Sequence, residues 1–257
     1  MDVEDFGLEY VDAAGETRCG PLEVMWPTRF EDGGPVRGFG SFKGQRNFTG
    51  WYWAATGAVH VGFESWLERD HLIRLDFDTR VVAVASQPFR LSWRREGQRR
   101  RIAHTPDYFV RRWDGSVLIM DVRPDGRIEP QDAAKFEATA LACRRVGWGY
   151  RRVGELDAVS TANVRWLAGY RHPRVLREPV ASDLRDVFGE GAGLLEGARA
   201  VGDPIAVLPV LFHLLWCQEL VVDLATLLSA TSVVGPARSA GKGADGGALE
   251  HAVAVGG

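Results

Sequence analysis

The sequence predicts an α/β fold in which a mixed sheet is flanked by helices. Apolar residues recur at helical spacing over 63–77, and further helices are expected at about 131–146 and 160–170. Between the first two helices lie four strand-like segments rich in Val, Ile, Phe and Tyr, at 80–85, 88–93, 102–110 and 116–122. Because these strands follow one another without helical crossovers, a Rossmann arrangement is excluded.

Local turn chemistry orders the later strands. The sequence Trp-Asp-Gly-Ser at 113–116 contains the Asp-Gly pair typical of tight hairpins. We therefore expect the later strands to form an antiparallel meander, with a short strand at 148–153 after the second helix. Residues 46–62 are aromatic without a helical period, and we expect them to be packed extended chain.

Composition divides the chain into four parts. Residues 1–45 are rich in Gly, Pro and turn formers and predict an irregular N-terminal arm, whereas 46–175 hold the sheet and its helices. Residues 176–235 predict a small helical, winged-helix-like module. Its expected elements are a helix interrupted at 189–193, an apolar helix begun by Asp203 and Pro204, and a possible hairpin. Residues 236–257, mainly Gly and Ala, are expected to be disordered.

Composition and charge exclude several classes of protein. Hydrophobic residues make up 46% of the 257 residues, which excludes wholesale disorder, and the net charge of −3 gives no global basic field for nucleic acid. The three cysteines lack the spacing of a disulfide framework or a zinc site. With no apolar run near the roughly 20 residues of a membrane span and no signal peptide at the start, we expect a cytoplasmic protein.

Three carboxylates occupy suggestive positions. Asp107 lies at the start of a strand in Thr-Pro-Asp-Tyr, and Asp121 ends the next strand, with Arg123 on the same face by alternation. Glu68, on the preceding helix, is expected to project toward the same end of the sheet. Charges among apolar strand residues are costly unless compensated, and Mg²⁺ takes carboxylate, water and phosphate oxygens as ligands. Such a site can hydrolyse a phosphodiester. The plainer reading makes Asp107 a turn cap and Asp121–Arg123 a surface ion pair.

These residues carry a family resemblance. Pro-Asp followed after 14 residues by Asp-x-Arg is similar to the PD-(D/E)xK motif of restriction-endonuclease-like proteins, with Arg where Lys is usual. The resemblance to TnsA, the endonuclease subunit of heteromeric transposases, covers roughly residues 45–175. It rests on the order of six segments: Phe-Glu-Ser-Trp-Leu-Glu-Arg-Asp (63–70), Ser-Gln-Pro-Phe (86–89), His-Thr-Pro-Asp-Tyr-Phe (104–109), Asp-Val-Arg-Pro (121–124), Gly-Trp-Gly-Tyr (147–150) and Asn-Val-Arg-Trp-Leu (163–167).

The resemblance implies a restriction-endonuclease-like mixed sheet and a Mg²⁺-dependent DNA endonuclease, with Mn²⁺ as a substitute. TnsA-type subunits nick the 5′ ends of a transposon, while a DDE-type transposase subunit cuts the 3′ ends and an AAA+ ATPase subunit joins target and cut. The implied partners are therefore these subunits and double-stranded transposon ends, with no membrane, and the protein would associate with the nucleoid when bound to DNA. Carried over to this chain, the metal-site residues are Glu68, Asp107 and Asp121, and Arg123 stands at the catalytic lysine.

Arg123 departs from the family pattern, because Arg stays charged and cannot take a proton from water as Lys can. It could still stabilise the charge of the transition state, Lys135 on the following helix could supply the amine, or the nuclease could be inactive. In the last case the chain would be a DNA- and protein-binding assembly subunit. A third reading places the same fold in restriction or repair. Glu64, four residues before Glu68, is the alternative helix carboxylate.

Other residues leave two readings each. Guanidinium groups cluster on one expected hairpin, where they either contact DNA phosphates or form a solvated sheet edge. Gln87 either lies near the metal or serves a turn, and His104 either approaches the scissile phosphate or makes a structural hydrogen bond. Trp51, Tyr52 and Trp53 either stack on nucleic acid or pack in the core. The hairpin guanidiniums are those of Arg90, Arg94, Arg95, Arg99, Arg100 and Arg101.

Overall fold

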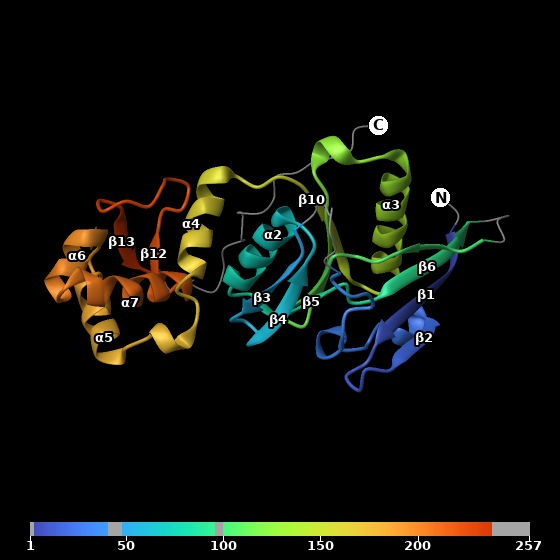
Figure 1. Ribbon diagram of the computed structural model, residues 1–257, viewed down its shortest axis with the longest axis horizontal. Coiled ribbons are helices and arrows are strands. Elements are labelled where there is room, and N and C mark those ends of the chain that lie inside the picture. The colour runs from blue at the N-terminus through green and yellow to red at the C-terminus, as the bar shows by residue number, and fades with distance from the viewer. Residues whose placement is uncertain (1–2, 41–47, 96–99, 238–257) are drawn as a thin grey trace.

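The central sheet of this protein is four-stranded and mixed, in the order β10-β9-β8-β5 (Figure 1). The computed structural model describes residues 3–40, 48–95 and 100–237. Strands β5, β8 and β9 pair antiparallel, and β10 lies parallel to β9. The expected α/β class, with a sheet flanked by helices, is confirmed. The strands are β5 (Val81–Ser86), β8 (Tyr108–Arg112), β9 (Val117–Val122) and β10 (Gly149–Val153), and the flanking helices are α2 (Trp66–Phe77) and α3 (Pro130–Arg145).

Alternation along β8 and β9 divides the interior into two cores. Leu118 and Met120 face the core that contains α2, whereas Phe109 and Ile119 face the core that contains α3. By the same alternation Asp121 belongs to the α3 side. The Asp-Gly turn forms as expected, because Gly115 adopts the left-handed conformation (φ 83°) that a tight β8–β9 hairpin requires.

Helix α2 begins three residues later than the periodicity predicts. Phe63 ends a strand, and the Ser65 side chain caps the helix by accepting a hydrogen bond from the Glu68 N–H (3.2 Å). Glu64 therefore precedes the cap, and the expectation that it is a helix carboxylate is wrong. The aromatic stretch before it is extended, as expected, in a hairpin of β3 (Gly50–Ala54) and β4 (Val59–Phe63).

The N-terminal segment corrects the expected irregular arm. It supplies two strands of a second sheet, in the order β2-β1-β6-β7, and Phe6 and Leu8 of β1 are buried in the α3-side core. The turn formers lie between regular elements and do not replace them. These elements are β1 (Val3–Val11), β2 (Thr17–Pro21), the short helix α1 (Leu22–Met25), β6 (Arg90–Arg95) and β7 (Ile102–His104).

The strand expected at 102–110 is two strands in two sheets. Pro106 lacks an N–H for a sheet ladder, and the chain leaves β7 at His104 and enters β8 at Tyr108. As a result, the antiparallel meander is confirmed only for β8 with β9, because β6 and β7 pair with each other in the second sheet. Asp107 thus lies in the short link between the sheets.

The C-terminal elements follow the expected order. The interrupted helix is two helices with a short strand between them, Asp203 caps the apolar helix through the Ile205 N–H (3.0 Å), and the hairpin forms. The small sheet has the order β11-β13-β12. The elements are α5 (Glu178–Val187), β11 (Ala192–Gly193), α6 (Leu194–Val201), α7 (Pro204–Trp216), β12 (Leu220–Val222) and β13 (Val233–Pro236). Most of the expected tail, 238–257, lies outside the described residues.

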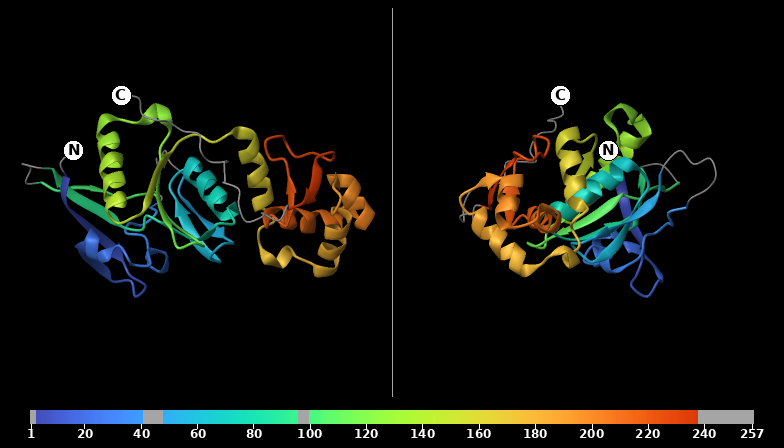
Figure 2. Two further views of the ribbon diagram at one scale, coloured as in Figure 1. Left: turned by 180° about the vertical axis from the view of Figure 1, so that it is seen from behind. Right: turned by 60° about the vertical axis from the view of Figure 1, so that its left-hand side comes forward.

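Helix α4 (Ala158–Ala168) lies between the central sheet and the C-terminal helices in both views of Figure 2. Arg165 of α4 forms a two-pronged ion pair with the buried Asp70 of α2, through Nε to Oδ1 (2.7 Å) and Nη2 to Oδ2. On its other side α4 contacts α7. Residues 158–168 therefore connect the helix that carries Glu68 to the C-terminal unit.

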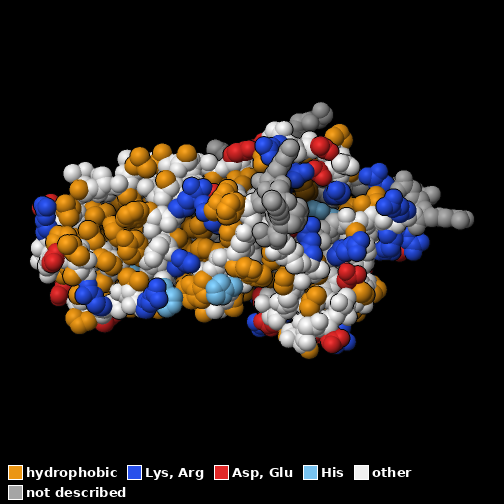
Figure 3. Space-filling view, viewed as in Figure 1, with side chains coloured by type: hydrophobic (Ala, Val, Ile, Leu, Met, Phe, Trp, Pro, Cys, Tyr) orange, Lys and Arg blue, Asp and Glu red, His pale blue; other side chains and the backbone are white. Residues whose placement is uncertain are grey.

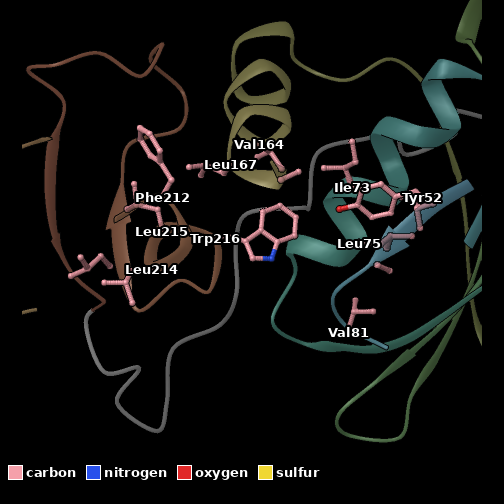
Figure 4. Packing of buried hydrophobic residues seen from close by; sticks show 14 of the residues in the cluster. Tyr52, Ile73, Leu75, Val81, Val164, Leu167, Phe212, Leu214, Leu215 and Trp216 are labelled. Atoms are coloured by element: carbon pink, nitrogen blue, oxygen red, sulfur yellow. The ribbon is translucent and has the colours of Figure 1, made fainter. Parts of the chain in front are cut away.

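One hydrophobic core runs through this connection. Trp216, at the end of α7, lies between Leu215 and the side chains of α2 (Figure 4), with its ring centroid 5.2 Å from that of Phe77. Among the described residues no single helix is long and apolar enough to cross a membrane. Helices α6 and α7 meet that criterion only as a pair bent by 119°.

We expect Trp216→Ala to lower the free energy of unfolding by about 3–5 kcal/mol, because Trp216 fills the shared core and is 5% exposed. Chemical denaturation should still show one transition, since the core is continuous. Trp113→Ala is the matched control: this side chain is 71% exposed and should change stability by less than about 0.5 kcal/mol. Two separate transitions in the wild type would contradict the shared core.

Candidate functional site

Strand pairing brings two of the three predicted carboxylates together. Tyr108 pairs with Met120, and continuing that antiparallel register by one residue puts Asp107 opposite Asp121. The backbone N–H of Val122 donates to Asp107 Oδ2 (2.7 Å), so the Asp107 side chain lies against the end of β9. The other carboxylate oxygen, Oδ1, has no hydrogen-bond partner in the described part of the chain.

Asp107 carries an electrostatic cost. Burial raises the pKa of its carboxyl well above the ordinary value, and the nearby charges of Glu68 and Asp121 raise it further. The Val122 hydrogen bond acts in the opposite direction and does not offset these effects. The carboxylates of Glu68, from α2, and Asp121, from the end of β9, therefore both act electrostatically on Asp107 at the start of β8.

Glu68 is held at the N-terminus of α2 by two hydrogen bonds. The Ser65 hydroxyl donates to Oε1 (2.9 Å) and the Glu64 N–H donates to Oε2 (2.7 Å), an arrangement close to a capping box. Burial raises the pKa of Glu68 despite these bonds. The Glu64 carboxylate pairs with Arg37 (2.6 Å), and its charge still contributes to the raised pKa of both Glu68 and Asp107. The preference for Glu68 over Glu64 as the site carboxylate stays a prediction. Of the two charges, that of Glu68 has the larger effect on the pKa of Asp107.

Asp121 is 2% exposed and both its oxygens are engaged. Oδ1 lies 2.8 Å from His104 Nε2, and Oδ2 accepts a hydrogen bond from the Tyr150 hydroxyl (2.7 Å). His104 therefore makes a hydrogen bond within the protein, as one of its two readings has it, and the partner is Asp121, which neither reading named. Tyr150 lies in one of the segments that carry the resemblance, but it was given no role at the site, because its contact with Asp121 depends on β10 pairing parallel with β9, which no local pattern encodes.

Arg123 pairs with a carboxylate of α3 at the end of β9. Its Nη2 donates to Asp132 Oδ2 (2.7 Å), and Lys135 Nζ lies 3.4 Å from Asp132 Oδ1. Partial burial would raise the pKa of Asp132, but the hydrogen bonds and charges of Arg123 and Lys135 lower it. The two cations proposed as alternatives for the lysine of the motif are thus neighbours across one aspartate.

The guanidinium cluster lies on the β6–β7 hairpin, far along the molecule from the C-terminal unit. Blue side chains gather there beside residues that are not described (Figure 3). Arg94 and Arg100 are exposed, while Arg101 is tied to the backbone carbonyl groups of Asp5 (2.5 Å) and Ser92 (3.1 Å). Arg99 lies outside the described residues. DNA contact by this cluster remains a prediction; Arg100 is exposed, and Arg94 is exposed with its Nη2 4.0 Å from Asp5 Oδ2.

The aromatic segment shows different exposure at each position. Trp51 is exposed, Tyr52 is buried with its hydroxyl donating to Asp76 (2.8 Å), and Trp53 stacks on His172 with ring centroids 4.6 Å apart. Tyr52 therefore packs in the core, and of this segment Trp51 is the side chain most open to a ligand.

The carboxylates of this site differ in how far their oxygens are open to a divalent cation. Within residues 3–40, 48–95 and 100–237, no group of three or more His, Cys, Asp or Glu side chains stands at metal-binding spacing. The oxygens of Glu68 and Asp121 are taken by protein donors, whereas Asp107 keeps one oxygen free. Because Mg²⁺ commonly binds through one or two carboxylates with water and phosphate, the donor chemistry at Asp107 fits this ion without a three-carboxylate cage.

Comparisons of the sequence with models of known protein families and with curated proteins found no match.

We expect Asp107→Asn to stabilise the metal-free protein at pH 8. The folded-state pKa of Asp107 lies above its unfolded value, so the folded state binds more protons between the two, and stability falls as pH rises through that window. The amide cannot ionise, and its oxygen can still accept from Val122. Thermal denaturation in EDTA should show a gain of about 1 kcal/mol at pH 8 that shrinks toward pH 4.

The control for this prediction is Asp78→Asn. Although burial favours the neutral form, the ion pair with Arg80 lowers the pKa of Asp78, so its charge stabilises the fold above the unfolded pKa. That variant should lose stability at pH 8. A loss of stability for Asp107→Asn of the same sign would show that Asp107 is a structural carboxylate.

Proposed function

We propose that this protein is a metal-dependent DNA endonuclease of the TnsA-like class, which hydrolyses phosphodiester bonds at the 5′ ends of a transposon. The observation that carries the proposal is the uncompensated charge of Asp107, whose pKa is raised by burial and by the carboxylates of Glu68 and Asp121. Perturbed, mutually repelling carboxylates are typical of functional sites, and a bound cation relieves their repulsion.

The architecture supports this proposal. A four-stranded mixed sheet carries one helix ahead of it in the chain and another before its parallel edge strand, which is compatible with a restriction-endonuclease-like fold. At the C-terminus, the succession of helix, strand, two helices and hairpin is compatible with a winged-helix-like module. Both fold names belong to the proposal.

The proposed roles follow from the contacts. When bound at Asp107, Mg²⁺ or Mn²⁺ would polarise the phosphodiester and make water more acidic. Ser65 and the Glu64 backbone hold Glu68 in place, and His104 and Tyr150 hold Asp121, so neither carboxylate needs to reorganise during the reaction. Arg123 would stabilise negative charge on the phosphate after exchanging Asp132 for it.

The C-terminal module is proposed to bind protein partners, namely the DDE-type transposase and AAA+ ATPase subunits. Helix α7 contains no Lys or Arg, and its exposed residues, such as Ile205 (85% exposed), are apolar. Hydrophobic side chains also spread over the surface of this unit in Figure 3. A helix of this kind offers no phosphate contacts but fits a protein interface.

The second candidate is a catalytically inactive assembly subunit that bridges DNA and its partner proteins. One observation favours it: the Arg123 guanidinium is paired with Asp132, and the oxygens of Glu68 and Asp121 are already engaged. Under this reading the site binds metal weakly and cuts no DNA.

Cleavage assays separate the two candidates. With the cognate transposase, DNA carrying the element's ends and Mg²⁺ or Mn²⁺, the wild type should nick the 5′ ends, and Asp107→Ala should lower the rate by at least about 100-fold. The Asp78→Asn variant should cut at the wild-type rate, because the Asp78 carboxylate pairs with Arg80 and contacts none of the site carboxylates. Active 3′ cutting by the partner without any 5′ nicks would support the assembly subunit and contradict the nuclease.

The two cations at Asp132 can be ranked in the same assay. If Arg123 stabilises the transition state, Arg123→Gln should slow cleavage by about 100-fold, whereas Lys135→Gln should change it by less than about threefold. Arg123→Lys should retain activity and add a rate increase toward high pH, because Lys can lose a proton. The reverse ranking would assign the motif's lysine role to Lys135.

A further inference from the structure

Gln87 is anomalous in three respects at once. Its side chain is 2% exposed, its Oε1 atom is buried with no hydrogen-bond partner, and its backbone is left-handed (φ 47°) although it is not glycine. A buried amide oxygen without a partner is destabilising, and such exceptions call for an explanation such as an ion or water. Within the described ranges, Oε1 of Gln87 is the only buried side-chain oxygen of this kind.

The position of Gln87 is tied to Asp107. Its N–H donates to the Asp107 carbonyl (2.9 Å), and its own carbonyl accepts from the Val36 N–H (3.0 Å). The preceding residue, Ser86, pairs with Tyr108 across β5 and β8. Both backbone groups of Gln87 are therefore bonded, and these bonds hold its left-handed conformation in place.

The same neighbourhood includes the start of α2. The Ser86 hydroxyl accepts from the Gly62 N–H (3.1 Å), and the Tyr108 hydroxyl lies 3.3 Å from the Glu68 carbonyl and 3.4 Å from that of Gly62. The ends of β4 and β5, the first turn of α2 and the start of β8 therefore meet here. The register of β5 with β8, continued by one residue past the Ser86–Tyr108 pair, puts Gln87 opposite Asp107, and residues opposite each other in an antiparallel pair face the same side of the sheet.

We propose that Oε1 of Gln87 is a neutral oxygen ligand for the divalent cation held at Asp107. This inference rests on the metal site of the proposed function. Amide oxygens are suitable ligands for hard cations. A neutral ligand also suits this site better than another carboxylate, because a further charge would add to the repulsion that Glu68 and Asp121 already exert on Asp107. The buried oxygen would then have its missing partner.

Cation titration of the full chain tests this assignment without any cleavage assay. The thermal denaturation midpoint is measured in EDTA and against increasing Mg²⁺, then Mn²⁺, because an ion that binds the folded state raises the midpoint with its concentration. Gln87→Met keeps the length and unbranched shape of the side chain but removes the oxygen. It should keep or raise the midpoint in EDTA and weaken the apparent affinity for both ions by about tenfold.

Gln218→Met is the matched control. Gln218 is also a left-handed glutamine (φ 57°), but its Nε2 donates to the Phe77 carbonyl (2.6 Å). This variant should lower the midpoint in EDTA and leave the cation affinity unchanged. A second variant, Gln87→Glu, guards against a folding effect of Met: its added charge should lower the midpoint in EDTA and tighten cation binding.

The outcomes separate the two proposals. If the wild type responds to the ions and Asp107→Asn does not, while Gln87→Met binds them as tightly as the wild type, the Gln87 assignment is wrong and the metal site stands. If Gln87→Met lowers the midpoint in EDTA as Gln218→Met does, the oxygen has a structural partner and the assignment is again wrong. If the wild type itself shows no response to either ion, the metal site of the proposed function fails, and the assignment with it.

Discussion

The pairing of β8 with β9 is the constraint on which the core and the candidate site both depend. It places Asp107 opposite Asp121, and through alternation it sends Leu118 and Met120 into one core and Ile119 into the other. A slip of one residue would exchange these faces, burying Asp121 on the α2 side and exposing apolar residues to the wrong neighbours. The apolar packing that stabilises the sheet therefore also fixes the positions of Asp107 and Asp121 relative to each other.

Several other buried or half-buried carboxylates of this protein have compensating partners, and Asp107 differs from them. Asp70, Asp78 and Asp132 each have a guanidinium partner, and Asp76 is buried among donors from Tyr52 and Thr56. Burial at Asp107 instead comes with two further negative charges. Proteins commonly keep such unfavourable arrangements where function requires them, at a cost in stability.

Local patterns were enough to predict what depends on nearby residues. The cap at Asp203, the Gly115 turn and the alternation of β9 all follow from a few consecutive residues, and the last two placed Asp107 and Asp121 side by side. What the sequence did not reveal depends on distant pairing. Strand β1 was hidden because its apolar residues flank Gly7 and lie among turn formers, and its partner β6 is some 80 residues away.

The site shows the same division. The partnership of Arg123 with Asp132 depends on how α3 is rotated against β9, and that of Tyr150 with Asp121 depends on the parallel register of β10. Neither is encoded in spacing along one element. The unpartnered oxygen of Gln87 is even harder to predict. Its lack of a hydrogen-bond partner becomes visible only in the folded interior.

The ion pair between Arg165 and Asp70 gives the molecule a mechanical connection between its ends. Asp70 lies two residues from Glu68 on α2, and Arg165 belongs to the helix that also rests on α7. A displacement of the C-terminal unit would pull on this ion pair. Because Asp70 and Glu68 belong to the same helix, the pull would reach the first turn of α2 and the Glu68 carboxylate. The two-pronged geometry resists rotation as well as separation, which makes the connection stiff.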